Sequence, residues 1–257
     1  QLGGSRVPED TTDPALRRLR NVVEEIAIAS GVPVPKVYVL EHEAGINAFA
    51  AGYSTSDAVV AVTRGALDRL NRDELQGVIA HEFSHILNGD MRLNIRLVGV
   101  LFGILMIGLI GRKILTHGRL GGSRSVSVVL IAAIVAMAIG YIGLFFGRML
   151  KAGVSRSRET LADASAVQFT RQAQGLAGAL KKIGGLHEGA KLNDRGDAEE
   201  VSHMLFGDGV GFSEQAFSGL FATHPPLLKR IQALEPGFRA EQLERLQAQW
   251  LASPPNG

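Results

Sequence analysis

Hydrophobic and polar positions in the first third of the chain predict a mixed unit of helices and strands. Asp13 followed by Pro14 marks a helix start, because the carboxylate can cap free backbone N–H groups and proline suits the first turn. Apolar residues then recur at helical spacing as far as Gly31. Short apolar runs separated by turn-forming residues predict strands at residues 37–40, 47–50 and 58–62.

Helical patterning dominates the rest of the chain outside two long apolar runs. A short helix over 65–70 precedes a longer one, which Asn71 and Glu74 are expected to start as a capping box. Residues 154–186 predict two further helices, and the Gly- and Asp-rich residues 187–211 predict a loop. The remainder reads as short helices interrupted by prolines.

Two stretches of the chain, residues 97–111 and 125–147, contain no charged side chain. The second is long enough to cross a bilayer as a helix. The first reaches that length only if Arg96, Arg112 and Lys113 extend their charged ends to the membrane surface. The alternative is a pair of buried core helices, which a domain of this size accommodates poorly.

The chain is therefore expected to be mainly α with a small β-sheet, an α+β fold interrupted by a transmembrane helical hairpin. No internal repeat is present. The expected divisions are a loose leader (1–12), one domain built from two segments (13–96 and 148–252), the hairpin (97–147, with helices at about 97–115 and 125–147) and a tail (253–257).

Composition narrows the classes of partner. The chain has 257 residues, no Cys and a formal net charge of +2. The absence of Cys excludes disulfides and thiolate metal ligands. The basic excess is small and is not interleaved with aromatic residues, so no nucleic-acid partner is expected. The chain begins at Gln1 rather than Met and shows no signal peptide, so we expect a fragment boundary or a processed end there.

The candidate chemistry lies in the stretch His81-Glu82-Phe83-Ser84-His85, which reads H-E-x-x-H inside a predicted helix. The two imidazoles fall one turn apart on one helical face, a spacing that suits a shared zinc ion, with a carboxylate beside them. A chain of this His and Glu content matches the motif by chance in roughly one case in a hundred. The motif therefore needs support from the rest of the chain.

A third metal ligand is expected downstream, because a catalytic zinc ion usually takes three protein ligands and keeps one position for water. That ligand could be a His, an Asp or a Glu. Glu159 and Asp163 are four residues apart and share a helical face, so one could bind metal while the other accepts a hydrogen bond from a ligating imidazole. The alternative is an ordinary solvated pair of acids, and His187 is a further candidate ligand.

The predicted hairpin gives an independent constraint on this site. Glu159 can meet His81 and His85 only if the chain between them crosses the membrane an even number of times, and two apolar runs satisfy that condition. His85 lies twelve residues before the first run, and Glu159 lies twelve residues after the second. Continuous helices would place the metal roughly 18 Å beyond the end of each run. The sequence thus predicts a site just above the membrane surface.

Three segments, HEFSHILNGD, SRSRETLAD and THPPLLKRI, together resemble the membrane zinc metallopeptidases of the HtpX and CaaX prenyl protease type. The resemblance covers about residues 13–235 and implies a zincin-like metallopeptidase domain interrupted by the hairpin. It also implies one Zn²⁺ per chain. The roles it assigns are zinc ligand for His81, His85 and Glu159, catalytic base for Glu82, and hydrogen-bond partner of His81 for Asp163.

The same resemblance assigns an edge strand that pairs with an extended peptide substrate through backbone hydrogen bonds. The alternative is a routine buried strand. His224 would donate to the developing oxyanion and Arg230 would support it electrostatically. The alternative for His224 is a helix N-terminal histidine before two prolines. The substrate-binding residues that the resemblance assigns are Asn47, Ala48, Phe49 and Ala50.

These features predict a membrane-anchored zinc metalloendopeptidase with peptide or membrane-protein substrates and the lipid bilayer as a partner. By resemblance, its role is quality control of misfolded proteins in the bacterial inner membrane, with a cytoplasmic catalytic domain. The Lys and Arg residues that flank the apolar runs on the catalytic side also favour a cytoplasmic catalytic domain. Two alternatives stay open: a site-specific processing protease of the CaaX type, and a membrane-anchored binding or chaperone module with a silent zinc site. A transporter is disfavoured, because neither apolar run holds a charge.

One departure from the family pattern concerns the N-terminal side. HtpX-like proteins usually carry further hydrophobic segments before the catalytic domain, and this chain shows none there. This departure agrees with the start at Gln1 and leaves open whether the chain is the whole protein.

Overall fold

The computed structural model describes residues 3–117, 125–186, 189 and 224–257. These residues form a mainly helical fold with a small sheet, as predicted. In chain order the described elements are β1 (Ser5–Arg6), α1 (Pro14–Ser30), β2 (Lys36–Leu40), β3 (Ala48–Ala51), β4 (Val59–Thr63), α2 (Arg64–Arg69), α3 (Arg72–Asn88), α4 (Asp90–His117), α5 (Ser125–Thr170), α6 (Gln174–Gly185), α9 (Leu227–Leu234) and α10 (Ala240–Ala252).

The sheet is mixed, with the strand order β1-β2-β4-β3. Strands β2 and β4 run parallel, and the outer strands β1 and β3 each pair antiparallel with a neighbour. Strand β1 lies in the segment expected to be a loose leader: Ser5 pairs with Val39, and Val7 is buried. Part of that leader is therefore ordered. A strand of two residues is too short to leave an alternating pattern in the sequence.

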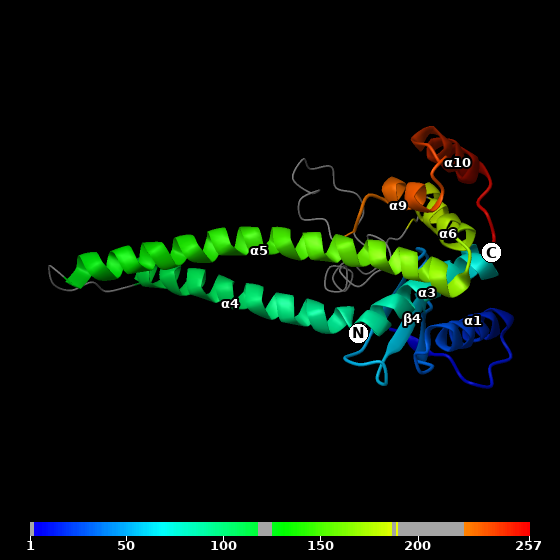
Figure 1. The fold of residues 1–257 in the computed structure, drawn as a ribbon, viewed down its shortest axis with the longest axis horizontal. Coiled ribbons are helices and arrows are strands. Elements are labelled where there is room, and N and C mark those ends of the chain that lie inside the picture. The colour runs from blue at the N-terminus through cyan, green and yellow to red at the C-terminus, as the bar shows by residue number, and fades with distance from the viewer. Residues whose placement is uncertain (1–2, 118–124, 187–188, 190–223) are drawn as a thin grey trace.

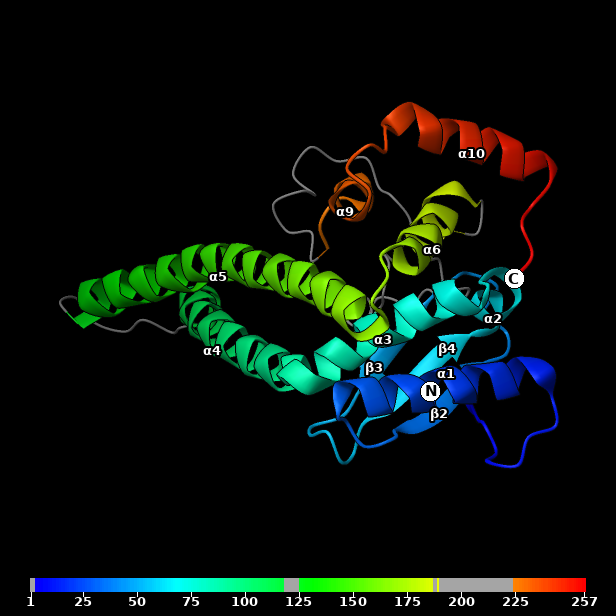
Figure 2. The same ribbon diagram turned by 45° about the vertical axis from the view of Figure 1, so that its right-hand side comes forward.

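Helix α3 lies between the sheet and α6 and also packs against α1 and α5 (Figure 2). The predicted capping box is present: Asn71 accepts from the backbone N–H of Glu74, and the Glu74 carboxylate accepts from that of Asn71. Gly89 ends the helix in the left-handed conformation. Leu75 and Phe83 are fully buried. The helix that carries the H-E-x-x-H motif is thus held on several sides.

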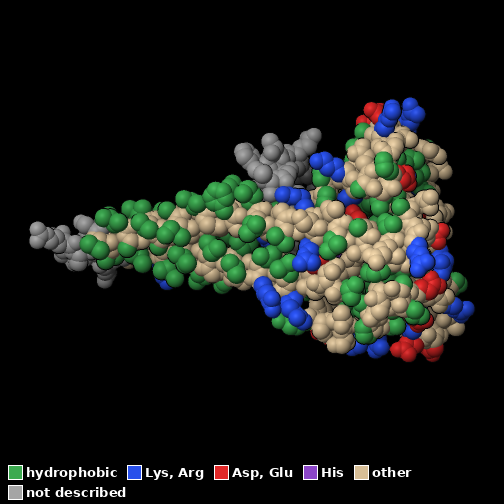
Figure 3. All heavy atoms as spheres, viewed as in Figure 1, with side chains coloured by type: hydrophobic (Ala, Val, Ile, Leu, Met, Phe, Trp, Pro, Cys, Tyr) green, Lys and Arg blue, Asp and Glu red, His purple; other side chains and the backbone are tan. Residues whose placement is uncertain are grey.

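Helices α4 and α5 project from the domain side by side as a rod (Figure 1). Apolar side chains cover the visible face of the rod (Figure 3), and Phe102 and Ile142 are 60% and 58% exposed. Only 6% and 11% of the most apolar windows of the two helices are buried, so these are not core helices of the domain. Both are long and apolar enough to cross a membrane.

Helix α5 is longer than the sequence pattern predicts. It runs for 46 residues from the second apolar run into the polar residues 154–170, where the pattern favours a separate helix. The change from apolar to polar side chains near Arg148 therefore marks a change of surroundings and not the end of a helix. As a result, one continuous helix carries Glu159 from the rod into the domain.

Small residues allow α4 and α5 to approach closely. A Cβ atom on Gly140 would lie 2.3 Å from the Cα atom of Gly108, and one on Gly111 would lie 2.7 Å from the carbonyl oxygen of Ala133. Such contacts between small residues are typical of helix pairs in membranes, where close van der Waals packing replaces the hydrophobic effect. The packing holds α4 and α5 together within the rod.

Candidate metal centre

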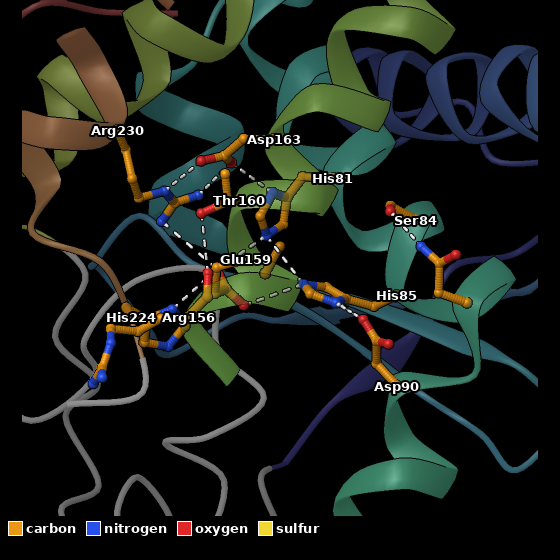
Figure 4. A network of polar contacts seen from close by, with 12 residues as sticks. His81, Ser84, His85, Asp90, Arg156, Glu159, Thr160, Asp163, His224 and Arg230 are labelled. Carbon is orange, nitrogen blue, oxygen red and sulfur yellow. Dashed lines mark hydrogen bonds and ion pairs between the residues drawn. The ribbon is translucent and has the colours of Figure 1, made fainter. Parts of the chain in front are cut away.

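Three predicted ligands converge between α3 and α5 (Figure 4). His81 and His85 lie one turn apart on α3, and their Nε2 atoms are 3.1 Å apart. Glu159 on α5 contacts both rings: its Oε2 atom lies 3.4 Å from His81 Nε2, and its Oε1 atom lies 3.3 Å from His85 Nε2. Residues 74 positions apart in the chain thus present one ligand atom each to a common point.

These separations fit a divalent metal. Ligands at about 2.0–2.1 Å from a tetrahedral zinc ion lie about 3.3–3.4 Å from one another. The two Nε2 atoms lie 3.1 Å apart, and each lies 3.3–3.4 Å from a different oxygen of Glu159, so every ligand pair has atoms close to that separation. Two imidazoles and a carboxylate also leave the fourth tetrahedral position for water, as in catalytic zinc sites.

Both imidazoles are held by carboxylates on their other ring nitrogen. His81 Nδ1 lies 2.9 Å from Asp163 Oδ1, and His85 Nδ1 lies 2.7 Å from Asp90 Oδ2. Such a contact fixes the tautomer and the ring orientation of a ligating histidine. The sequence pattern suggests Asp163 but leaves Asp90 unassigned, although a carboxylate directly after the helix-ending Gly89 is a signal that could have found it.

Arg230 reaches this network from α9. Its Nε and Nη2 atoms each donate to one oxygen of Asp163 at 2.8 Å, and its Nη1 atom lies 3.9 Å from Glu159 Oε2. The guanidinium is 4% exposed, so the paired contact compensates a charge that is out of water. In the described geometry Arg230 therefore positions Asp163, where the sequence led us to expect support for an oxyanion.

The electrostatics of the pocket favour positive charge. Burial opposes protonation of both imidazoles, yet Asp163 and Glu159 raise the pKa of His81, while Asp90 and Glu159 raise the pKa of His85 to about 10. Burial also opposes ionisation of Glu159, but the surrounding imidazoles lower its pKa well below the usual range. A pocket that stabilises protons on both rings is one in which a cation is stabilised.

Glu82 is buried beside the ligands, and its carboxylate makes few polar contacts with the described residues. Burial raises the pKa of its carboxyl group to about 6, although the imidazoles of His85 and His81 act in the opposite direction. Among the described residues, neither carboxylate oxygen has a hydrogen-bond partner of ordinary geometry. The backbone of Ala50 is nevertheless close enough to lower the pKa slightly. A buried carboxylate of this kind is suited to exchange a proton with a bound water or substrate.

His224 lies on the other side of Glu159, just before α9. It is 7% exposed, and its Nδ1 atom is 3.1 Å from Glu159 Oε2. Its position before two prolines agrees with the alternative of a helix N-terminal histidine, and its ring also faces the ligand set (Figure 4). The structure thus brings His224, Arg230, Glu82 and the three ligands into one cluster.

Strand β3 lies at one end of the sheet, next to α3. The backbone oxygen of Asn47 accepts from Thr63 on β4, so the backbone groups of Ala48 and Ala50 point away from β4 because pairing alternates along an antiparallel strand. This agrees with the effect of the Ala50 backbone on Glu82. Phe49 is 8% exposed, as the alternative of a routine buried strand requires. Both descriptions therefore fit β3.

A cleft runs from the ligands towards the base of the rod. Its walls come from β3 and the turn after it, from α3, and from the first turns of α4 and the middle of α5. Residues that line it include Ala50, Glu82, His85, Leu97, Lys151 and Glu159. Leu97 begins the first apolar run, so the cleft connects the candidate metal centre with the point where the rod leaves the domain. His187, a further candidate ligand, lies outside the described residues.

This arrangement of two histidines, a glutamate and a buried free carboxylate defines a metallopeptidase. Residues 15–236 match the model of peptidase family M48, and the chain belongs to that family. A protease HtpX homolog of Dictyoglomus turgidum is 40% identical over 216 residues, which make up 84% of this chain and 68% of that protein. A protease HtpX homolog of Listeria monocytogenes is 38% identical over 229 residues, covering 84% and 72%.

Among solved structures, Ste24p of S. mikatae has a similar fold. The TM-score is 0.55 at 19% identity, and the match covers 90% of this chain and 51% of that one, so the chain spans about half of Ste24p. Together with the two apolar helices, the relatives identify the chain as a membrane-associated metalloprotease. This confirms the predicted family and enzyme class.

Proposed function

We propose that the protein is a zinc-dependent metalloendopeptidase in which His81, His85 and Glu159 hold one Zn²⁺ ion per chain. The observation that carries the proposal is the convergence of the three side chains, whose ligand atoms all lie within 4.8 Å of one another, beside a buried carboxylate without a strong partner among the described residues. His, His, Glu is a ligand set that zinc commonly fills, and no thiolate competes for the role.

The chemistry divides between the ion and the chain. When bound, zinc lowers the pKa of a water molecule towards about 7 and polarises the scissile carbonyl group. Glu82 takes the proton that the attacking water loses and passes it to the amine that leaves. A carboxyl pKa near 6 suits both steps, because the group gives up and accepts a proton near neutral pH.

The residues around Glu159 complete the machinery. His224 donates a hydrogen bond to the oxyanion of the tetrahedral species from its buried position beside Glu159. Arg230 holds Asp163, and Asp163 in turn holds the ring of His81. The positive charge of Arg230, whose Nη1 atom lies 3.9 Å from Glu159 Oε2, also supports the oxyanion electrostatically.

The substrate is an extended peptide that lies along β3. The outward-facing carbonyl group of Ala48 and the backbone of Ala50 pair with it, while the N–H of Ala48 donates to Asn47 Oδ1, and Asn47 and Phe49 hold the strand in place from its sheet side. Backbone pairing needs no particular side chain, so it suits a protease with many substrates. The position of β3 at the end of the described sheet and the cleft that Ala50 and Ala51 line support this assignment.

The biological substrates are misfolded or damaged membrane proteins, and the protein is a multi-pass protein of the inner membrane with a cytoplasmic catalytic domain. Support comes from the HtpX relatives and from a cleft that ends at the base of the rod. A tag inserted at Gly121 tests the orientation, because it should be digested by protease added from outside the cell. Protection of the tag from outside contradicts the cytoplasmic assignment.

The proposed chemistry is tested by zinc content and casein cleavage of the purified protein, with and without a chelator. We expect one zinc per chain, cleavage that the chelator abolishes, and recovery of cleavage with added zinc. The matched variant is Glu82→Gln, which should keep its zinc and lose about 10²–10⁴-fold in rate. A Glu82→Gln protein that binds zinc and cleaves at the normal rate contradicts the assignment, and a zinc-loaded wild type without cleavage favours a silent binding module.

A further inference from the structure

Four basic side chains lie at the base of the rod, where it meets the domain. We call them the collar: Arg92 and Arg96 on α4, and Arg148 and Lys151 on α5. Figure 3 shows Lys and Arg side chains gathered at this junction. The sequence from Met91 to Arg158 contains no Asp or Glu, so both helices enter the domain through a region of one sign of charge.

The collar lies at the depth of lipid headgroups if the second charge-free run fills the hydrocarbon core and Arg96 extends its charged end to the membrane surface. Arg92 and Arg96 precede the first run by five residues and one residue, which is about 7.5 and 1.5 Å along a helix. Arg148 and Lys151 follow the second run by one and four residues, or about 1.5 and 6 Å. The polar layer on each side of the core is about 5–8 Å thick.

The arginines of the collar are open to solvent. Arg92, Arg96 and Arg148 are exposed. Among the described residues, none of the four collar side chains forms an ion pair, whereas Arg158 further along α5 is paired with Asp90. Arginines and a lysine of this kind interact with anionic headgroups at a gain of about 1 kcal/mol each.

The aromatic side chain of Tyr53 contacts the collar. Arg92 donates from Nη2 to the backbone oxygen of Tyr53 at 3.0 Å, and its guanidinium lies 4.8 Å from the centre of the Tyr53 ring. Tyr53 is nevertheless 57% exposed, in the turn between β3 and β4. The one carboxylate of that turn, Asp57, is engaged by the backbone N–H groups of Tyr53 and Ser54. Tyrosine is enriched at this depth of membrane proteins.

From these contacts we infer that the collar and Tyr53 form a binding surface for anionic phospholipid headgroups. Charge complementarity and continuity with the lipid-facing rod commit the surface to the bilayer that the rod spans. Because Gly52, Tyr53 and Ser54 also line the cleft, the headgroups set the position of strand β3 relative to the membrane. The inference rests on the membrane insertion of α4 and α5 and not on the proposed zinc chemistry.

The first test locates the turn without any use of catalysis. The variant Tyr53→Trp in a Trp250→Phe background is reconstituted in vesicles of phosphatidylcholine or of phosphatidylcholine with phosphatidylglycerol, each with lipids brominated high on the acyl chain. We expect quenching of the emission of the introduced indole that increases with phosphatidylglycerol. The wild type, whose only Trp is Trp250 on α10, should show little quenching. Absence of quenching at position 53 in both vesicles overturns the inference.

The second test removes charge from the collar. In Arg96→Gln/Arg148→Gln, the apparent affinity for phosphatidylglycerol should fall about fivefold per arginine removed, so quenching at a given phosphatidylglycerol fraction should be weaker. The matched control, Arg112→Gln/Lys113→Gln, removes the same charge near the far end of α4 and should leave quenching unchanged. Equal effects of the two pairs overturn the inference.

Cleavage of a soluble peptide by the otherwise unmodified chain gives a readout that does not depend on the introduced indole. Phosphatidylglycerol should stimulate cleavage by the wild type and by the Arg112→Gln/Lys113→Gln control, and it should stimulate Arg96→Gln/Arg148→Gln less, with equal rates in neutral vesicles. If the collar variant instead loses cleavage of acidic peptides equally in both vesicles, the collar binds substrate and the lipid assignment is wrong.

Discussion

Helices α3 and α4 follow one another across a single glycine, yet they bury opposite kinds of side chain. Helix α3 buries His81 and Glu82 at 0% and 1% exposure, while α4 exposes Val100 and Phe102 at 63% and 60%. In a protein surrounded by water, apolar side chains are mostly buried and charged side chains mostly exposed, and each helix departs from one half of that rule. Buried polar groups need partners, and large exposed apolar surfaces need a cover.

The difference teaches what each helix requires to be complete. The buried groups of α3 surround a point that a metal ion fits, and the exposed groups of α4 have the length and character of a membrane span. The buried groups of α3 thus suit a metal ion and the exposed groups of α4 suit a bilayer, although only a few helical turns separate them. Gly89, in the left-handed conformation, marks the change between them.

We expect the largest effect on zinc binding and cleavage from a change at the ligands of α3. His85→Ala should lose both zinc and peptide cleavage to the background of the assay, because two protein ligands do not hold a catalytic metal tightly. The control is His117→Ala, at the exposed end of α4, which should keep both. Metal analysis and a cleavage assay check both variants, and retention of stoichiometric zinc by His85→Ala would contradict the assigned ligand set.

The next effect concerns the surroundings of α4. Phe102→Asp should cost about 3 kcal/mol of membrane insertion, or roughly 100-fold, because it places a carboxylate in the hydrocarbon core. Leu251→Asp alters a side chain of α10 that is 78% exposed, and it should change nothing because α10 faces water. The fraction of each protein extracted from membranes by alkali measures the difference. Equal extraction of the two variants speaks against a lipid-facing α4.

We expect a smaller effect from the carboxylates that hold the two imidazoles of α3. Asp163→Asn and Asp90→Asn should each weaken zinc binding by about 10–100-fold, because each carboxylate orients one imidazole. The effect at Asp163 should be larger, because that change also leaves the guanidinium of Arg230 without its paired carboxylate. Competition with a zinc indicator measures both affinities. The opposite ranking would show that Arg230 does not act through Asp163.

The smallest effect concerns the rod itself. Gly140→Ala should lower the free energy of unfolding by about 1–3 kcal/mol, because the added Cβ meets the backbone of Gly108. Gly99→Ala adds the same atom where nothing lies within 4 Å and should be neutral. Thermal unfolding in detergent compares the two. A similar loss at Gly99 would show that the contact with Gly108 is not the cause, because the higher helix propensity of alanine cannot account for a loss.

Much of this molecule could be predicted from local sequence. The capping residues, the three strands and the two apolar runs each leave a pattern within a few residues, and His81, Glu82 and His85 form a contiguous motif. Glu159 could be proposed because it shares a helical face with Asp163, and an even number of membrane crossings allows it to meet the histidines. The family resemblance supplied the remaining roles.

Features that depend on distant contacts could not be predicted in the same way. The bond between Arg230 and Asp163 joins residues 67 positions apart, and neither shows it locally. The support of His85 by Asp90 depends on how α4 restarts after Gly89. Helix α5 passes through a change of surroundings without a break, and periodicity within the polar half does not reveal that it continues the apolar half.

The central claim is that the buried polar groups of α3 and Glu159 of α5 bind one zinc ion. Zinc-edge X-ray absorption of the purified protein tests it most directly, because the spectrum counts imidazole ligands. We predict two imidazoles and oxygen ligands at about 2.0–2.1 Å in the wild type, and one imidazole in whatever zinc remains on His85→Ala. A wild-type spectrum with other than two imidazoles, or one that His85→Ala leaves unchanged, would contradict the account.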